Sequence, residues 1–148
     1  MMTLDELVHE YESEINGMYT DKFLDYFHNP RNIGDIVDPD GWAEDSGECN
    51  DTMSIYLKIR DDRIVDARFW TDGCGATIVC GSVVTELVKN KNVTEAINIS
   101  ASDIIRFLED IPPENVHCAI LAADTLQKAL KDYADKNRQR NGVVQFTD

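Results

Sequence analysis

The feature that most restricts the fold is a strict period of two at residues 53–60, followed by a less regular alternation that ends near residue 71. Such alternation is typical of strands with one buried and one solvated face. The pair Asp61-Asp62 separates the two runs, so we predict an antiparallel hairpin. A third strand is predicted beside it at residues 42–48. The apolar positions of the first run are Met53, Ile55, Leu57 and Ile59.

Helical periodicity dominates the rest of the chain. Thr20 or Asp21 is the expected N-cap of the second helix, and Ser100 with Asp103 forms an approximate capping box before a short helix. The predicted fold class is therefore α+β: a small antiparallel three-stranded sheet with helices packed on one face and at the ends. The longer helices are predicted at residues 3–14, 20–28, 76–89 and 118–136.

The length of 148 residues is that of one domain, so we expect a single domain over residues 1–148. Residues 1–18 are interpreted as an N-terminal helical extension and residues 137–148 as a loose tail. The N-terminus lacks the basic and apolar regions of a secretory signal and is too acidic for a transit peptide. No apolar run approaches the ~20 residues that span a bilayer. We expect a cytoplasmic protein that does not enter a membrane.

The chain is strongly acidic, with 28 acidic against 14 basic residues and a formal net charge of −14. This charge repels nucleic acid and argues against DNA or RNA as a partner. Two interpretations stay open. The charge can serve solubility, or it can form an acidic face that steers the protein toward a basic partner.

Four cysteines are present, and no pair has the C-x-x-C spacing of thioredoxin-type redox sites and zinc ribbons. Structural disulfides are disfavoured in a reducing cytosol. Either the thiols are core residues or several of them converge on one metal. We interpret Cys80, one to two turns into an apolar helix, as a core residue. The other three are Cys49, Cys74 and Cys118.

Each of these three cysteines falls at a predicted element boundary, where side chains from distant segments can meet at one end of a sheet. Cys74 and Cys118 also fall at predicted helix N-termini, where free N–H groups and the helix dipole lower a thiol pKa. Asp51 follows Cys49 by two residues, and His117 adjoins Cys118. The pattern predicts three thiolates, one carboxylate and one imidazole around a single point.

Such a ligand set suits zinc and iron–sulfur chemistry. A carboxylate in the fourth place should hold iron less firmly than a thiolate would. A site of this kind is useful where the metal group has to leave again.

The chain resembles the U-type iron–sulfur cluster scaffold family, which comprises the IscU-like proteins and the N-terminal part of NifU. The resemblance runs from about Tyr19 to Asp135. The matching pieces are "FHNPRNIG" (27–34), "GECNDTMSIYLKI" (47–59), "DARFWTDGCGATIVCGSVVTELVKNK" (66–91) and "IPPENVHCAILAADTLQKALKDY" (111–133).

The resemblance implies a non-enzymatic scaffold that binds iron and a [2Fe–2S] cluster through Cys49, Asp51, Cys74 and Cys118, with His117 as the alternative to Asp51. It implies that Cys118 accepts persulfide sulfur from a cysteine desulfurase of the IscS/NifS type. Clusters then pass to recipient apo-proteins. Electrons and iron have to come from outside, for which a ferredoxin and an iron donor are the candidates. Zinc is a candidate ion for the apo form.

The chain departs from the family pattern at three places. Asn50 stands where the family usually has Gly, and Cys80 stands where it usually has a small residue. Glu114-Asn115 replaces the Val-Lys that usually follows the double proline, which reverses the local charge and argues against recognition by a dedicated Hsp70-type chaperone. His117 and the "GCGA" stretch favour the IscU/NifU branch over the zinc-dependent SufU branch.

Two other functions remain open from the sequence. The first is a zinc-bound sulfurtransferase that accepts persulfide and builds no cluster. The second is a regulatory subunit whose acidic surface docks on the desulfurase.

Overall fold

The computed structural model describes residues 3, 4, 6, 18–48 and 50–140. Its sheet has three antiparallel strands in the order β1-β2-β3. The predicted hairpin is confirmed as β2 and β3, and the predicted third strand is confirmed as β1. The α+β fold class is confirmed with them. The strands are β1 (Gly41–Ser46), β2 (Thr52–Arg60) and β3 (Arg63–Thr71).

The helices follow the predicted order with shifted ends. Thr20 is the N-cap of α2, and the capping box of Ser100 and Asp103 precedes α5, as expected. Helix α6 begins two residues before the predicted start and continues through Arg140, so residues 137–140 are helical rather than loose. Residues 141–148 and most of the predicted helix 3–14 lie outside the described residues. The helices are α2 (Asp21–His28), α3 (Gly75–Val88), α4 (Val93–Ala96), α5 (Ala101–Phe107), η1 (Pro113–Asn115) and α6 (Val116–Arg140).

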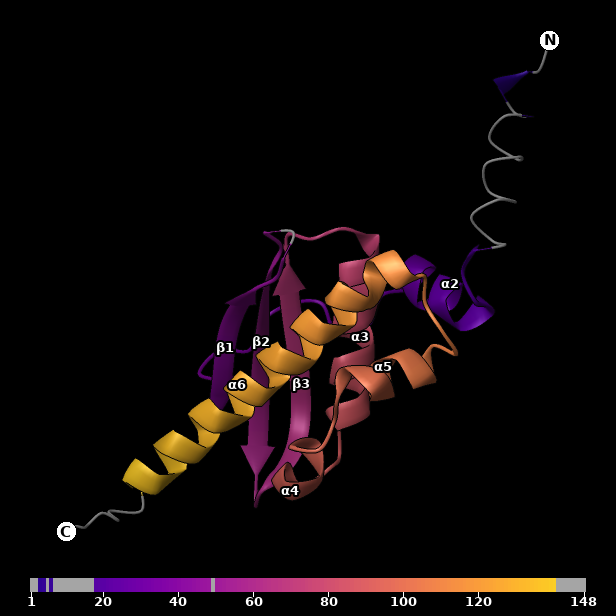
Figure 1. Ribbon diagram of the computed structural model, residues 1–148. Coiled ribbons are helices and arrows are strands. Elements are labelled where there is room, and N and C mark those ends of the chain that lie inside the picture. Colours follow the sequence, from indigo (N-terminus) through magenta and orange to yellow (C-terminus); the bar gives the residue numbers. More distant parts are fainter. Residues whose placement is uncertain (1–2, 5, 7–17, 49, 141–148) are drawn as a thin grey trace.

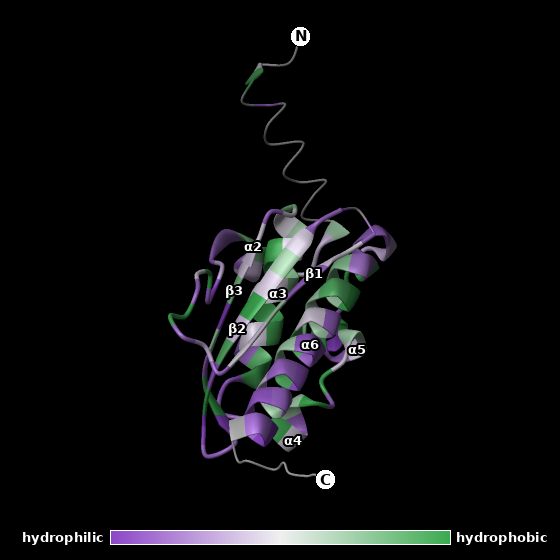
Figure 2. Ribbon diagram, turned by 90° about the vertical axis from the view of Figure 1, so that its left-hand side faces the viewer, coloured by the Kyte–Doolittle hydropathy of each residue, from purple (hydrophilic) through white to green (hydrophobic). Residues whose placement is uncertain are grey.

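Helices α3 and α6 pack on the same face of the sheet (Figures 1 and 2). The odd-numbered residues of β2 point to this face and are buried, which is why the period of two in the sequence is so regular. The opposite face carries Trp42 and Trp70, which are 42% and 48% exposed. Burial is therefore one-sided, and the site-bearing loops emerge from a sheet that the two helices hold in place.

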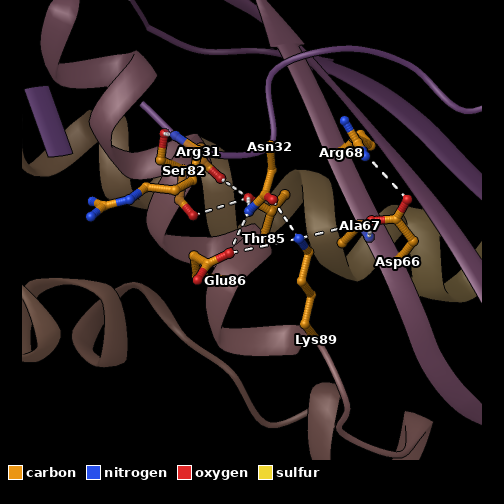
Figure 3. Close-up of polar contacts among 10 residues, drawn as sticks. Arg31, Asn32, Asp66, Ala67, Arg68, Ser82, Thr85, Glu86 and Lys89 are labelled. Carbon is orange, nitrogen blue, oxygen red and sulfur yellow. Dashed lines mark hydrogen bonds and ion pairs between the residues drawn. The ribbon is translucent and has the colours of Figure 1, made fainter. Parts of the chain in front are cut away.

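The turn after α2 is fastened to α3 and β3 by Asn32 (Figure 3). Its amide nitrogen donates to Thr85 Oγ1 at 3.0 Å and to Glu86 Oε2 at 2.9 Å, and its amide oxygen accepts from Lys89. The backbone N–H of Phe69 donates to the Asn32 carbonyl at 3.0 Å. Asn32 has φ +67°, a left-handed conformation that asparagine tolerates well. The side chain thus organises this turn.

Within the part of the chain that the structure describes, no helix combines the length and the apolar character needed to cross a bilayer.

Candidate metal centre

Three segments far apart in the sequence meet at one end of the sheet (Figure 1, upper end). They are the connection between β1 and β2, the bend between β3 and α3, and the first turn of α6. Hydrogen bonds hold the first two together. The Thr52 N–H donates to Asp72 Oδ1 at 2.8 Å, and the Thr71 hydroxyl donates to the Thr52 carbonyl at 2.6 Å. The bend is therefore fixed against the start of β2.

Asp51 belongs to a tight turn before β2. The Gly47 N–H donates to the Asp51 carbonyl at 2.8 Å, and the Asn50 N–H donates to the Gly47 carbonyl at 3.1 Å. Asn50 has φ +63°, the left-handed region that glycine favours and asparagine tolerates. Asn50 can therefore keep a turn that a glycine would make. The Asp51 side chain is half-buried and its Oδ2 accepts a hydrogen bond of 2.8 Å from the Thr77 hydroxyl.

Cys74 is the exposed N-cap of α3. Partial burial raises the pKa of its thiol, but the backbone N–H groups of Thr77 and Ala76 and the Thr77 hydroxyl lower it by more in sum. The pKa therefore lies below its ordinary value, as the helix N-terminus predicts. The Cys74 side chain makes no regular N-cap hydrogen bond. The nearby backbone N–H groups instead stabilise the negative charge of the thiolate.

The glycines on both sides of Cys74 are required by close approaches. A Cβ on Gly73 would lie 2.8 Å from Asp51 Oδ2 and 2.8 Å from the Thr77 side chain. A Cβ on Gly75 would lie 2.3 Å from the ring of Phe27. These two positions let the bend pass close to Asp51 on one side and to α2 on the other, which leaves Cys74 at the surface.

Cys118 is the third residue of α6 and is fully buried. Its sulfur lies 3.6 Å from His117 Nε2 and accepts a hydrogen bond of 3.4 Å from the Thr77 hydroxyl. Burial raises the pKa of the Cys118 thiol to about 11. The Thr77 hydrogen bond opposes this, while Cys74 and Asp51 add to it. The expectation of a thiolate favoured by the helix N-terminus is therefore wrong for Cys118, because the loss of solvation on burial outweighs the hydrogen bond from Thr77.

Asp51, His117 and Cys118 converge. One ligand atom from each, an oxygen, a nitrogen and a sulfur, all lie within 4.8 Å of one another. Cys74 joins the group through Thr77, whose hydroxyl is 3.6 Å from the Cys74 sulfur. Four of the five predicted site residues thus come to one place. Cys49, the fifth, lies outside the described residues, and its part in the site stays a prediction.

Thr77 is the site residue that the sequence analysis missed. It is fully buried in the first turn of α3 and touches Asp51, Cys74 and Cys118. A signal was available: it is a hydroxyl residue in an apolar stretch, three residues after Cys74 and so on the same helix face. Cys80, one turn further, is fully buried as predicted. Burial raises its pKa far above the usual range.

The donor set can bind a metal ion. Imidazole and thiolate are ligands for zinc and iron, and a carboxylate oxygen can take a further position. Binding requires Cys118 to lose its proton, so metal uptake and proton release are coupled. Cys74 is exposed at the edge of the group, whereas Cys118 is buried.

Residues 18–140 match the family described as the NifU-like N-terminal domain. The iron-sulfur cluster assembly scaffold protein IscU 1 of Archaeoglobus fulgidus is 44% identical over 121 residues, which is 81% of this chain and 79% of that protein. The iron-sulfur cluster assembly scaffold protein IscU of Escherichia coli is 40% identical over 130 residues, which is 82% of this chain and 98% of that protein.

Solved structures share the fold. The N-terminal part of a NifU-like protein from Brucella abortus superposes with a TM-score of 0.67 at 19% identity and covers 82% of this chain and 98% of that chain. A scaffold protein described for the SUF system of Fervidobacterium islandicum has a TM-score of 0.65 at 24% identity and covers 77% of this chain and 97% of that chain. At these identities the likeness concerns the fold alone.

Proposed function

The chain belongs to the NifU-like N-terminal domain family, and we propose that it is a scaffold on which a [2Fe–2S] cluster is assembled and then passed to apo-proteins. One observation carries the proposal: the ligand atoms of Asp51, His117 and Cys118 lie within 4.8 Å of one another beside the exposed Cys74. The cluster in this proposal is cargo. Cys49, Cys74 and Cys118 supply thiolates, and Asp51 supplies the fourth, weaker bond.

The mixed ligand set suits a cargo that must leave. A carboxylate holds iron less firmly than a thiolate, so the fourth ligand is the first that a recipient protein can replace. His117 is close enough to take the same position when Asp51 leaves it. A scaffold with two alternative fourth ligands can release one bond while the thiolates still hold the cluster.

Sulfur would arrive on Cys118 by thiol exchange with a cysteine desulfurase. The Cys118 thiolate attacks the outer sulfur of the donor persulfide, an S–S bond forms on Cys118, the S–S bond of the donor breaks, and the donor cysteine leaves as a thiolate. Each transferred sulfur needs two electrons to become sulfide, for which we propose a ferredoxin. Because Cys118 is a buried thiol in the resting molecule, docking of the desulfurase has to uncover it first.

The proposal treats recognition by an Hsp70-type chaperone as disfavoured. Of the pair that departs from the family pattern, Glu114 is exposed, whereas Asn115 is buried and its side-chain amide donates to the Tyr19 hydroxyl at 3.3 Å. The reversed charge is therefore on the surface, where a partner would meet it.

The test is anaerobic reconstitution with iron and sulfide. We expect visible thiolate-to-iron absorption in the unaltered chain and its loss in Cys49→Ser, Cys74→Ser and Cys118→Ser. Cys80→Ala is the matched control, because it removes a thiol that is buried in the core. Retention of the absorption in all three Ser variants would contradict the proposal.

A zinc-bound sulfurtransferase is the second candidate, and the mixed oxygen, nitrogen and sulfur donor set favours it. It predicts one tightly held zinc, transfer of persulfide sulfur, and no uptake of iron under anaerobic conditions. Metal analysis of the anaerobically purified chain, followed by the same reconstitution, separates the two candidates.

A further inference from the structure

The Thr77 hydroxyl is where the candidate ligands meet. Its oxygen lies 2.8 Å from Asp51 Oδ2, 3.4 Å from the Cys118 sulfur and 3.6 Å from the Cys74 sulfur. The residue is fully buried. One side chain therefore contacts three candidate ligands that come from three separate segments.

Buried threonines in helices normally donate to a carbonyl of their own helix. Thr125 in α6 does so, with a bond of 2.7 Å to the Leu121 carbonyl, and Thr85 in α3 donates to the Gly81 carbonyl at 2.7 Å. Thr77 is in the first turn of α3, where the residue four positions back, Gly73, precedes the helix. Its hydroxyl is therefore free of the usual i−4 bond and donates to Asp51, 26 residues away in the sequence.

The backbone next to Thr77 is shaped around the same contact. A Cβ on Gly73 would lie 2.8 Å from both Asp51 Oδ2 and Thr77 Oγ1. Only a residue without a side chain leaves the carboxylate and the hydroxyl at hydrogen-bonding distance. The Asp51–Thr77 contact thus depends on the hydroxyl of Thr77 and on the absence of a side chain at Gly73.

We infer that Thr77 is a positioning residue that holds the Asp51 carboxylate by Oδ2 and so presents Oδ1 to the metal. This inference rests on the proposed function only in taking Asp51 as a ligand. A hydroxyl has one proton, and at 2.8 Å the carboxylate oxygen is the acceptor that it reaches best. With Oδ2 engaged by the hydroxyl, Asp51 is favoured as a ligand through Oδ1, and coordination through one oxygen keeps the fourth bond weak.

Without the hydroxyl, the Asp51 side chain can rotate, and His117 becomes the better-placed fourth ligand. Residues that orient a metal ligand in this way typically change metal affinity about 10-fold to 100-fold when mutated. Thr77 would therefore decide which of the two alternative groups completes the site.

The experiment uses Co(II) as a probe, because its visible absorption reports the ligand set and requires no cluster assembly. Co(II) affinity and spectrum are measured for the full chain, Thr77→Val, Thr77→Ser, Asp51→Ala and the double variant Thr77→Val with Asp51→Ala. Thr125→Val is the matched control, since it removes a buried hydroxyl from a helix without touching the site. Cluster lifetime in air after anaerobic reconstitution is measured on the same set.

We expect Thr77→Val to bind Co(II) about 10-fold more weakly and to show a changed spectrum. Thr77→Ser, which keeps the hydroxyl, should retain the affinity and the spectrum of the unaltered chain. In the Asp51→Ala background, Thr77→Val should have a much smaller effect on Co(II) affinity, because only the contacts of the hydroxyl with the two sulfurs remain to be lost. As a single variant, Thr77→Val should shift the cluster lifetime in the same direction as Asp51→Ala. If Thr77 had only a structural role, Thr77→Val would lower Co(II) affinity equally with and without Asp51→Ala.

If Thr77→Val changes Co(II) affinity equally in both backgrounds, or in neither, the inference is overturned. Normal cluster formation on the unaltered chain would in that case still support the proposed function. The expected Co(II) pattern in a chain that forms no cluster would overturn the proposed function and support the inference. A chain that binds neither Co(II) nor a cluster would overturn both.

Discussion

The sulfur of Cys118 lies 3.6 Å from Nε2 of His117, its neighbour in the first turn of α6. The two side chains present different donor atoms at one point, and the Asp51 carboxylate completes the group. In the proposed metal centre the imidazole and the carboxylate are alternative ligands for one position, which would give the site two ways to complete its coordination.

Single loss of either competing ligand should be tolerated. We expect His117→Ala and Asp51→Ala each to keep cluster absorption after anaerobic reconstitution, and the double variant to lose it, because only then is the fourth position vacant. Asp51→Ala should give a cluster that lasts longer in air. Glu114→Ala, which removes an exposed carboxylate in η1, is the control. A double variant with an unchanged spectrum would argue against both residues as ligands.

The three described cysteines should differ sharply in alkylation. Cys74 is exposed and has a lowered pKa, whereas Cys80 and Cys118 are buried with raised pKa values. In the reduced, metal-free protein at about pH 7.5, iodoacetamide should label Cys74 first, because the thiolate is the form that reacts. Mass spectrometry of the labelled peptides measures the order. In denaturant the three rates should converge, and comparable native rates for Cys74 and Cys118 would contradict the structure.

Alkaline pH should destabilise the metal-free protein through Cys118. Its folded pKa is raised to about 11, so the unfolded chain loses this proton first, and stability falls as pH rises from the unfolded value toward 11. The expected contribution is ~1–2 kcal/mol of unfolding free energy. Urea unfolding of the unaltered chain and Cys118→Ala, each at about pH 8 and about pH 10.5, should show the smaller loss in the variant. An equal loss in both would be inconsistent with the raised pKa.

Gly73 and Gly47 make a matched pair at the same end of the sheet. A Cβ on Gly73 would come within 2.8 Å of Asp51 and Thr77, whereas a Cβ on Gly47 would meet only the Leu121 side chain, no closer than 3.4 Å. Gly73→Ala should therefore weaken Co(II) binding about 10-fold, with Gly47→Ala close to the unaltered chain. Titration followed by visible absorption measures both, and equal affinities would show that the close approach at Gly73 does not matter for the site.

Asn32 should matter for stability and not for metal binding. Asn32→Ala removes the amide that joins the turn to Thr85, Glu86 and Lys89, and it leaves alanine in a left-handed conformation. We expect a loss of about 2 kcal/mol or more in unfolding free energy. Asn98→Ala, at an exposed residue with one long contact of 3.4 Å, should cost less than about 0.5 kcal/mol. Urea unfolding separates the two.

The sheet could be predicted because burial on one face leaves a direct trace in the sequence. Met53, Ile55 and Leu57 are completely buried under α3 and α6, and every second residue of β2 had to be apolar. The ends of α6 were harder to predict. The helix was expected over residues 118–136, but it begins at Val116, directly after η1, and continues through Arg140.

The positions of the site residues could be predicted better than their chemistry. Boundary positions correctly brought Asp51, Cys74, His117 and Cys118 together. The pKa of Cys118 could not be predicted, because it depends on how deeply α6 is buried, and that is a property of the packed molecule. Thr77 was overlooked for a related reason: its spacing from Cys74 indicated a shared helix face, but its contacts with Asp51 and Cys118 arise only from packing.

Because Cys74 is the N-cap of α3, whatever its sulfur binds is electrically coupled to that helix. Negative charge on the sulfur favours the first turn of α3, and this effect falls off within that turn. In the proposed scaffold, a loaded and an empty site should therefore differ in the stability of the first turn of α3, a difference confined to the end of the helix that carries Cys74.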